Sequence, residues 1–307
     1  MAENQTACSD RQDFSFDVQY CPLINFAMQQ NHVPIIRRLL IKNETREDMG
    51  NLTLTIISTP ELIRPYTKQI ALLPAQTDLD IGFVDLQLQP EFLAGLTERL
   101  AGEIVMSLGL ADGSALLEKT IPIDVLAFDE WGGGAVLPEL LCSFVTPNHP
   151  AIADILGQAA VFLNQWTKDP SLDGYQRKDP NRVRQQSAAI YSALQARQLV
   201  YCPPPASFEQ NGQRIRLADV LLEKKMGTCL DLSLLYAACL EADGLNPVLN
   251  IIKDHAFAGV WLVDACFPET LQDDVSLLAK KTAAGIQDLL LVETTAFVAG
   301  KSVPFDD

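Results

Sequence analysis

Polar and apolar residues alternate along several short segments of the first 125 residues. The alternation is clear at Phe14, Phe16, Val18 and Tyr20, and it is typical of half-buried strands. Similar β-like segments follow at 39–41, 52–56, 69–73, 80–88, 103–108 and 116–125. Turn signals separate them, namely Pro60, Pro74, Pro90 and the Asp112-Gly113 pair, and residues 91–99 predict a short helical insertion. Short strands at this spacing predict an antiparallel, immunoglobulin-like β-sandwich over residues 1–129.

The hydrophobic period becomes helical beyond residue 150. Ile152, Ile155, Ala159 and Leu163 fall on one face of a predicted helix, and a second helix is expected over about 181–198. Between the two patterns, residues 130–150 contain a run of three glycines and several prolines. This composition predicts a linker over 130–150, followed by a second domain over 151–307. The expected fold class is therefore α+β.

A strong helix pattern starts at Gly227-Thr228-Cys229. Thr228 is a good N-cap, and Gly244 stands where a left-handed C-terminal residue is expected. Cys229 then falls in the first turn, where free backbone N–H groups and the helix dipole favour a thiolate. Cys239 lies in the interior of the same helix and is expected to fill the core.

Two predicted strands follow this helix, over 248–252 and 255–263. His255 begins the second strand, whereas His32 and His149 lie in the β-rich half and in the predicted linker. A nucleophilic thiol needs an imidazole within hydrogen-bonding reach and a third polar group that orients the imidazole. His255 is therefore the expected general base for Cys229.

Charge and cysteine content narrow the classes of function. The 307 residues include 23 Lys and Arg against 39 Asp and Glu, giving a net charge of −16, which argues against a surface that coats nucleic acid. No signal peptide is visible in the first ten residues, and no apolar stretch is long enough to span a membrane. The seven cysteines are odd in number and form no CxxC pair. These features predict a cytoplasmic protein with reduced thiols.

The Gly227-Thr228-Cys229 and His255-Ala256-Phe257 segments resemble the core of the transglutaminase-like cysteine protease superfamily. In that superfamily, a further strand ends in an acidic residue that orients the histidine. The resemblance implies that Glu293, which follows the apolar segment 288–292, takes this role, with Glu replacing Asp and Thr294 replacing Pro. The intervening residues 264–286 form an insertion. The implied domain is a papain-type α+β fold that needs no cofactor.

A wider resemblance includes the segment 201–209 with its Pro203-Pro204-Pro205 run. It is similar to the N-terminal region of large bacterial proteins, in which an Ig-like and a transglutaminase-like module precede a domain of unknown function and a superfamily 1 helicase-type region. The resemblance implies that these residues form the front part of a longer polypeptide, with a helicase-type region downstream.

Several of these residues also have a purely structural interpretation, beside the functional one. A helical cysteine is by base rate a buried structural residue, and the spacings of Cys229, Cys239, Cys266 and His255 fit no zinc pattern, so no metal is expected. The cations at 177, 178, 182, 184 and 197 predict a solvated helix face with internal ion pairs, and docking of a nucleic acid or partner domain is the minority alternative. Gln213 is a guess for a second oxyanion donor besides the backbone N–H of Cys229.

The leading hypothesis is thiol-dependent acyl chemistry on amides, with peptide hydrolysis by Cys229, His255 and Glu293. The substrate is then a protein or peptide, without a membrane partner. The alternative is a catalytically silent transglutaminase-like interaction module that is attached to a helicase-type protein. Both hypotheses need the same folded core, so reactivity of the Cys229 thiol is the property that separates them.

Overall fold

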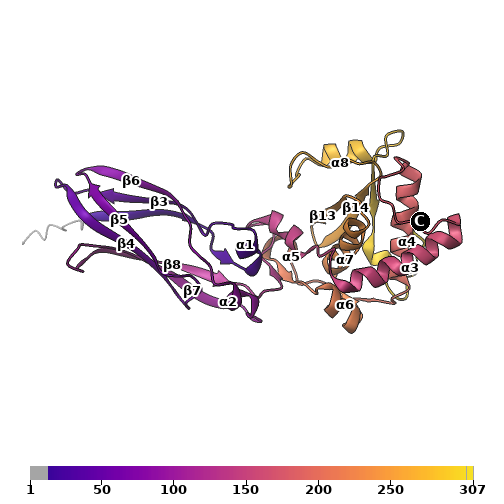
Figure 1. Cartoon of the computed structure of the whole chain (residues 1–307), viewed down its shortest axis with the longest axis horizontal. Helices are drawn as coiled ribbons and strands as arrows, with labels where there is room; N and C mark the ends of the chain where they lie inside the picture. The colour runs from indigo at the N-terminus through magenta and orange to yellow at the C-terminus, as the bar shows by residue number, and fades with distance from the viewer. Residues whose placement is uncertain (1–12, 302, 307) are drawn as a thin grey trace, which may run out of the picture. The chain divides into compact units, whose positions relative to one another are not determined.

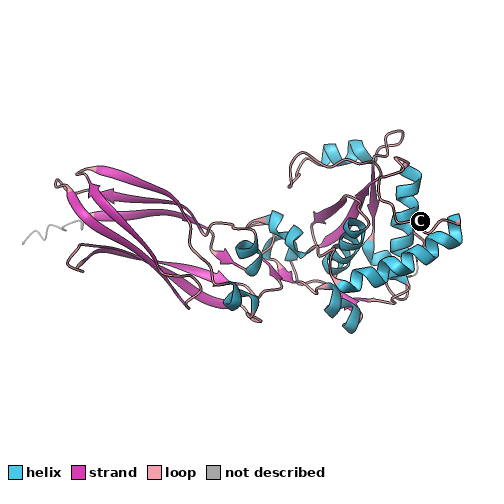
Figure 2. Cartoon of the chain, in the orientation of Figure 1, coloured by secondary structure: helices cyan, strands magenta, loops and turns pink. Residues whose placement is uncertain are grey.

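The computed structural model describes residues 13–301 and 303–306 (Figure 1). Cys8 and the first ten residues, in which the sequence shows no signal peptide, lie outside this range. The fold is α+β, with about 30% helix and 31% strand (Figure 2). The chain divides into two compact units, the first ending at Phe128 and the second beginning at Asp129. Within the described residues, no helix is both long and apolar enough to cross a membrane.

Over residues 13–128, the first unit consists of two β-sheets with two short helices. The three-stranded sheet has the order β1-β3-β6, and the five-stranded sheet has the order β2-β8-β7-β4-β5. The strands are β1 (Phe14–Tyr20), β2 (Leu23–Ile24), β3 (Ile36–Asn43), β4 (Met49–Thr59), β5 (Tyr66–Leu73), β6 (Thr77–Val84), β7 (Leu100–Gly109) and β8 (Ala115–Val125), and the helices are α1 (Phe26–Gln30) and α2 (Pro90–Ala94).

Alternation along the strands explains how these sheets form. In β4, Leu52, Leu54 and Ile56 are fully buried, and the residues between them are partly exposed. Each neighbouring strand pairs antiparallel with β4, and Leu54 lies opposite Leu108 of β7. The seven longer strands lie where the alternation predicts them. The two-residue strand β2, which pairs in parallel with β8, and helix α1 were not predicted, because segments this short carry no periodic pattern.

The second unit is built around a three-stranded antiparallel sheet with the order β13-β14-β15. Its main elements are α3 (Pro150–Thr167), α4 (Pro180–Gln195), α7 (Cys229–Ala242), β13 (Pro247–Ile252), β14 (His255–Trp261) and β15 (Leu289–Val292). Its shorter elements are β9 (Glu130–Trp131), η1 (Pro138–Phe144), β10 (Val200–Tyr201), α5 (Phe208–Asn211), β11 (Gln213–Arg214), α6 (Ala218–Lys224), β12 (Met226–Gly227), α8 (Val275–Thr282) and η2 (Thr294–Phe297).

Helix α7 is the central helix of this unit. It packs against β13 and β14 on one side and against α3 and α4 on another (Figure 1). The sequence predicts one buried face, but every residue from Cys229 to Leu240 is buried. A helix that is apolar around its whole circumference is enclosed on all sides. The start of α7 therefore lies inside the unit, close to the strands that follow it.

Residues 130–150 differ from the predicted linker, because most of them are packed into the second unit. Trp131 is buried and pairs through β9 with Gln213 of β11. Leu141 and Phe144 join Trp131 in the cluster that surrounds Cys229 and Leu230. Glycine is required at position 133 because the backbone of another segment passes close to it. A Cβ at Gly133 would lie 2.1 Å from the Gln210 carbonyl oxygen.

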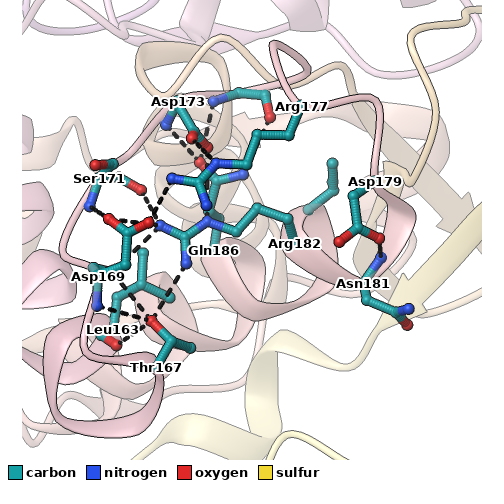
Figure 3. A network of polar contacts seen from close by, with 12 residues as sticks. Leu163, Thr167, Asp169, Ser171, Asp173, Arg177, Asp179, Asn181, Arg182 and Gln186 are labelled. Carbon is teal, nitrogen blue, oxygen red and sulfur yellow. Dashed lines mark hydrogen bonds and ion pairs between the residues drawn. The ribbon is translucent and has the colours of Figure 1, made fainter.

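The predicted internal ion pairs of the cationic residues are present, as Figure 3 shows for Arg177, but Arg182 is buried and not solvated. Arg182 is only 4% exposed and donates hydrogen bonds to the backbone carbonyls of Asp169 and Ser171. Arg177 pairs with the carboxylates of Asp169 and Asp173. These contacts fold the segment between α3 and α4 onto α4, so the arginines are engaged within the unit.

Candidate functional site

Cys229 is the first residue of α7, and the turn before it is held by a capping box. The Thr228 hydroxyl accepts the backbone N–H of Asp231, and the Asp231 carboxylate accepts the backbone N–H of Thr228. Asp231 is buried and also accepts hydrogen bonds from the backbone N–H and the guanidinium of Arg216, both at 2.9 Å. This reciprocal bonding holds the Cys229 backbone rigidly.

Gln213 lies beside this turn. Its side-chain amide donates to the Thr228 hydroxyl at 2.9 Å, and its own side-chain oxygen is buried without a hydrogen-bond partner among the described residues. One N–H of Gln213 is thus occupied by the N-cap, while a second N–H remains on the same nitrogen. The guess of Gln213 as an oxyanion donor stays a prediction, and its observed contact is to the cap.

His255 and Glu293 come together at the edge of the three-stranded sheet. His255 is the first residue of β14, and the strand pairs Ala258 with Val292 of β15. Glu293 follows directly on Val292, so it leaves the sheet beside the first residues of β14. The distance from Nε2 of His255 to Oε2 of Glu293 is 2.7 Å. This contact uses Nε2 and leaves Nδ1 as the second nitrogen for proton transfer.

The second oxygen of the Glu293 carboxylate also accepts a hydrogen bond. Oε1 accepts the backbone N–H of Thr295 at 2.8 Å, which makes Glu293 the N-cap of η2. Burial raises the pKa of Glu293, but the hydrogen bonds from His255 and Thr295 outweigh it and lower the pKa overall. The carboxylate is therefore ionised at neutral pH and oriented toward the imidazole.

A buried hydroxyl pair connects the cysteine helix to the segment that carries Glu293. Oγ of Ser233 donates to the Cys229 carbonyl at 2.7 Å and lies 2.9 Å from Oγ1 of Thr294. Sequence reasoning did not single out Ser233. Its position four residues after Cys229 places it one helical turn away, which was the available signal.

The Cys229 thiol lies at the start of β14 and is fully buried. The backbone N–H of Ala256, next to His255, interacts with the thiol, and Glu293 is close enough for its charge to act on it. Burial raises the pKa of Cys229 more than the N–H groups of Ala256 and Leu230 lower it. The sequence predicts a lowered pKa from the helix terminus, and the structure differs because the thiol is shielded from water.

Tyr201 lies near the thiol. The pKa of Tyr201 is raised, first by burial and then by the nearby Cys229 and Cys202. Strand β10 pairs in parallel with β12, and Tyr201 lies opposite Gly227, two residues before Cys229. Sequence reasoning noted the segment from Tyr201 only as part of a resemblance and missed this position.

The other candidate residues lie away from this arrangement. Asp264 follows the far end of β14, where its charge acts on Tyr175, which donates to the Trp261 carbonyl. Cys239 is buried inside α7, and burial raises its pKa strongly. No group of three or more His, Cys, Asp or Glu side chains within the described residues is arranged to hold a metal ion.

The arrangement thus places a thiol at the start of α7 near the beginning of β14, where an imidazole contacts an ionised carboxylate that follows β15. The contact observed within this set is the one between His255 and Glu293. Such a set can pass a proton from sulfur to nitrogen and hold the resulting imidazolium. Compared with known proteins, the chain matches no family model and no curated protein.

Proposed function

We propose that the second unit is a transglutaminase-like, papain-type cysteine peptidase domain, and that the first unit is an immunoglobulin-like sandwich that precedes it. The observation that carries the proposal is the 2.7 Å contact between His255 and Glu293 beside the buried thiol of Cys229. An acid that orients a histidine next to a thiol at a helix start is the arrangement that thiol acyl chemistry requires.

In the proposed reaction, the Cys229 thiol gives its proton to His255, and the sulfur attacks the carbonyl carbon of an amide. The imidazolium, held by Glu293, protonates the leaving nitrogen as the C–N bond breaks, which leaves a thioester on Cys229. A water molecule then loses a proton to His255 and attacks the thioester. This step releases the carboxylic acid and restores the thiol.

The test is hydrolysis of a mixed peptide library by the purified chain, followed by mass spectrometry. The wild type is expected to cleave amides, and the C229A and H255A variants are expected to lose this activity. Cys239→Ala is the matched control, because Cys239 lies in the same helix away from His255. Equal activity in the C229A variant and the wild type would overturn the proposal.

A second function is favoured by one observation, the complete burial of Cys229 in a cluster that includes Trp131, Phe144 and Phe208. A catalytically silent interaction module that kept the fold would have no need of an accessible thiol. Alkylation separates the two functions, because a peptidase needs a Cys229 thiolate that reacts below the pH at which an ordinary thiol ionises, whereas an interaction module does not.

We also infer a cytoplasmic location in a bacterial cell, with a helicase-type region of the same polypeptide as the partner. The support for the location is that Cys21, Cys142, Cys202, Cys229, Cys239 and Cys266 are all free thiols. The helicase-type partner rests on sequence resemblance alone. Sequencing of the gene beyond codon 307 tests it.

A further inference from the structure

Strand β13 forms one edge of the sheet in the second unit, where its only strand partner among the described residues is β14 (Figure 1). The opposite edge strand, β15, is contacted by α8. The pairing of β13 with β14 is regular from Pro247 to Ile252, without a bulge. No residue of β13 is fully buried, and Ile252 is 52% exposed. β13 is therefore a regular edge strand that is open to solvent.

The register shows which backbone groups of β13 point away from β14. In an antiparallel pair, residues that exchange hydrogen bonds alternate with residues that do not. The backbone N–H of Trp261 donates to the Asn246 carbonyl at 3.0 Å, so every second residue counted from Asn246 bonds to β14. The N–H and C=O groups of Leu249 and Ile251 therefore point toward the open edge. No hydrogen bond joins these groups to another segment of the described chain.

The absence of charge distinguishes β13 from the long edge strands of the first unit. Proteins usually protect edge strands against further pairing with charged residues, bulges, proline or short length. The edge strands of the first unit carry exposed charges, namely Asp17 in β1, Lys68 in β5 and Asp80 in β6. β13 has the uncharged sequence Pro-Val-Leu-Asn-Ile-Ile, and its proline lies at the first position. Such an edge is a template for one more strand.

Charge and contact chemistry indicate what that further strand is. A second copy of this chain carries the same net charge of −16, and this repulsion opposes pairing between two copies. The edge itself offers backbone groups and aliphatic side chains. Leu249 and Ile251 pack toward the cluster that contains Cys229, and Val248 and Ile252 alternate with them on the other face. These groups fit an extended peptide with alternating apolar residues, and the acidic chain favours a peptide that is basic.

We propose that β13 is a docking strand that binds an extended, basic segment of another polypeptide by strand addition. The N–H and C=O groups of Leu249 and Ile251 form hydrogen bonds with the peptide backbone, and apolar side chains of the peptide lie beside Val248 and Ile252. Such recognition tolerates many sequences but requires free backbone N–H groups in the peptide. The inference does not depend on the proposed hydrolysis, because a peptidase and a silent interaction module have the same open edge.

The first test measures hydrogen exchange of single backbone amides by NMR. The full chain carries Cys229→Ala, so that binding is measured without the thiol. The probe is the peptide acetyl-Lys-Thr-Val-Thr-Val-Thr-Val-Lys-amide, and its control is the same peptide with N-methyl groups on the four central residues. Without the probe, the amides of Leu249 and Ile251 are expected to exchange about tenfold or more faster than those of Asn250 and Ile252, which bond to β14.

The probe is expected to slow exchange at Leu249 and Ile251 about tenfold, whereas the N-methylated peptide should leave it unchanged. Exchange that stays fast with the probe in millimolar excess would overturn the proposal. Exchange that slows when the protein alone is concentrated would show pairing between two copies, and would overturn the choice of partner. Loss or retention of peptide cleavage in the library assay does not alter either result.

The second test removes one outward N–H from the edge. Ile251→Pro leaves the hydrogen bonds to β14 in place, because the N–H of Ile251 does not face β14. It is expected to weaken binding of the fluorescently labelled probe about three- to tenfold, the effect of one hydrogen bond. Ile251→Val is the matched control, which keeps the N–H and a branched side chain. Equal affinities in the two folded variants would overturn the proposal. If the proline variant does not fold, the exchange measurement on the native strand decides.

Discussion

Glu293 and Asp264 are two carboxylates that follow His255 in the sequence, and they lie at opposite ends of β14. Glu293 contacts His255, whereas the charge of Asp264 acts on Tyr175 near Trp261. A strand of this length separates its ends by about 3.3 Å per residue, so Asp264 cannot reach the imidazole.

We therefore expect Glu293→Gln to lower turnover by about 10² to 10⁴, because the base loses the carboxylate that orients it. Asp264→Asn is the matched control and should leave the chemical step unchanged. The measurement is kcat on a cleaved peptide, with thermal stability compared in the same buffers. A larger loss in the Asp264 variant would contradict the assignment.

Tyr201 lies near the Cys229 thiol, and we expect its ring and its hydroxyl to affect access to the thiol separately. Removal of the ring should expose Cys229 and reduce the burial that raises its pKa, so that the N–H groups of Ala256 and Leu230 dominate. We expect Tyr201→Ala to raise the iodoacetamide rate at Cys229 at least tenfold and to lower the apparent pKa of the thiol below that of the wild type.

Tyr201→Phe keeps the ring and removes only the hydroxyl, so its alkylation rate should lie between the other two. Mass spectrometry of the tryptic peptide that contains Cys229, from pH 6 to 10, gives both quantities. Identical profiles for the alanine variant and the wild type would show that Tyr201 is not the barrier.

Asp243, the C-cap of α7, is a buried acid that destabilises the fold when ionised. Burial and the nearby charge of Asp173 raise its pKa to about 7, partly offset by Arg182, and neither side-chain oxygen has a hydrogen-bond partner among the described residues. Because the pKa is higher in the folded than in the unfolded state, the folded form binds more protons between pH 4 and 7. This group therefore makes the free energy of unfolding decrease as the pH rises through that range, with no further change above it.

Asp243→Asn should remove this dependence and raise the free energy of unfolding at pH 8 by about 1–3 kcal/mol, a value reduced from the full shift for residual solvation. Urea unfolding of both proteins at pH 5 and pH 8 measures it. The difference between the two proteins should be larger at pH 8. A difference that does not depend on pH would refute the assignment.

At the scale of elements, the site depends on how α7 is joined to the segment after β15. Ser233 and Thr294 share the buried hydroxyl contact between them, and Ser233 also binds the Cys229 carbonyl. The contact holds the residue after Glu293 against the cysteine helix. The loss of one hydroxyl leaves the other buried without this partner, which costs about 1–3 kcal/mol.

We expect Ser233→Ala and Thr294→Val to destabilise the protein individually and the double variant to lose less than the sum. The coupling energy in this cycle should be about 0.5–1.5 kcal/mol. Free energies of unfolding from urea titrations of the four proteins give it. Strict additivity would mean that the two hydroxyls do not act together.

At the scale of the whole molecule, the position of the boundary between the two units can be tested with fragments. Trp131, Leu141 and Phe144 belong to the buried cluster around Cys229, although the composition of 130–150 resembles a linker. Loss of a single buried aromatic side chain costs about 3–5 kcal/mol, and whole domains are stable by only about 5–15 kcal/mol.

A fragment of residues 129–307 is therefore expected to unfold cooperatively on heating, whereas a fragment of 151–307 should show no cooperative transition. A fragment of 1–128 should fold by itself as a β protein. Circular dichroism melts of the three fragments test this. A cooperative transition in the shortest C-terminal fragment, at the same temperature as the longer one, would place the boundary near 150 instead.

Much of the fold could be predicted because it depends on local patterns. The alternation at Leu52, Leu54 and Ile56 and the Thr228 cap before Cys229 are readable within a few residues, since a side chain's face is set by the geometry of its own element. Cys229, His255 and Glu293 were named from order along the chain and from a resemblance. The acid was named from the resemblance, and it lies at His255, 38 positions away, because β15 returns antiparallel to β14.

The remaining features depend on contacts between distant segments, which no local pattern encodes. The burial of Cys229 in a cluster with Trp131 and Phe208, the Ser233–Thr294 contact and the position of Lys301 beside Tyr201 each join residues from separate elements. The sequence by itself determined which residue starts the helix and which starts the strand. Only the tertiary structure decided that the thiol is shielded, because desolvation depends on every group packed around an atom and not on its place in the chain.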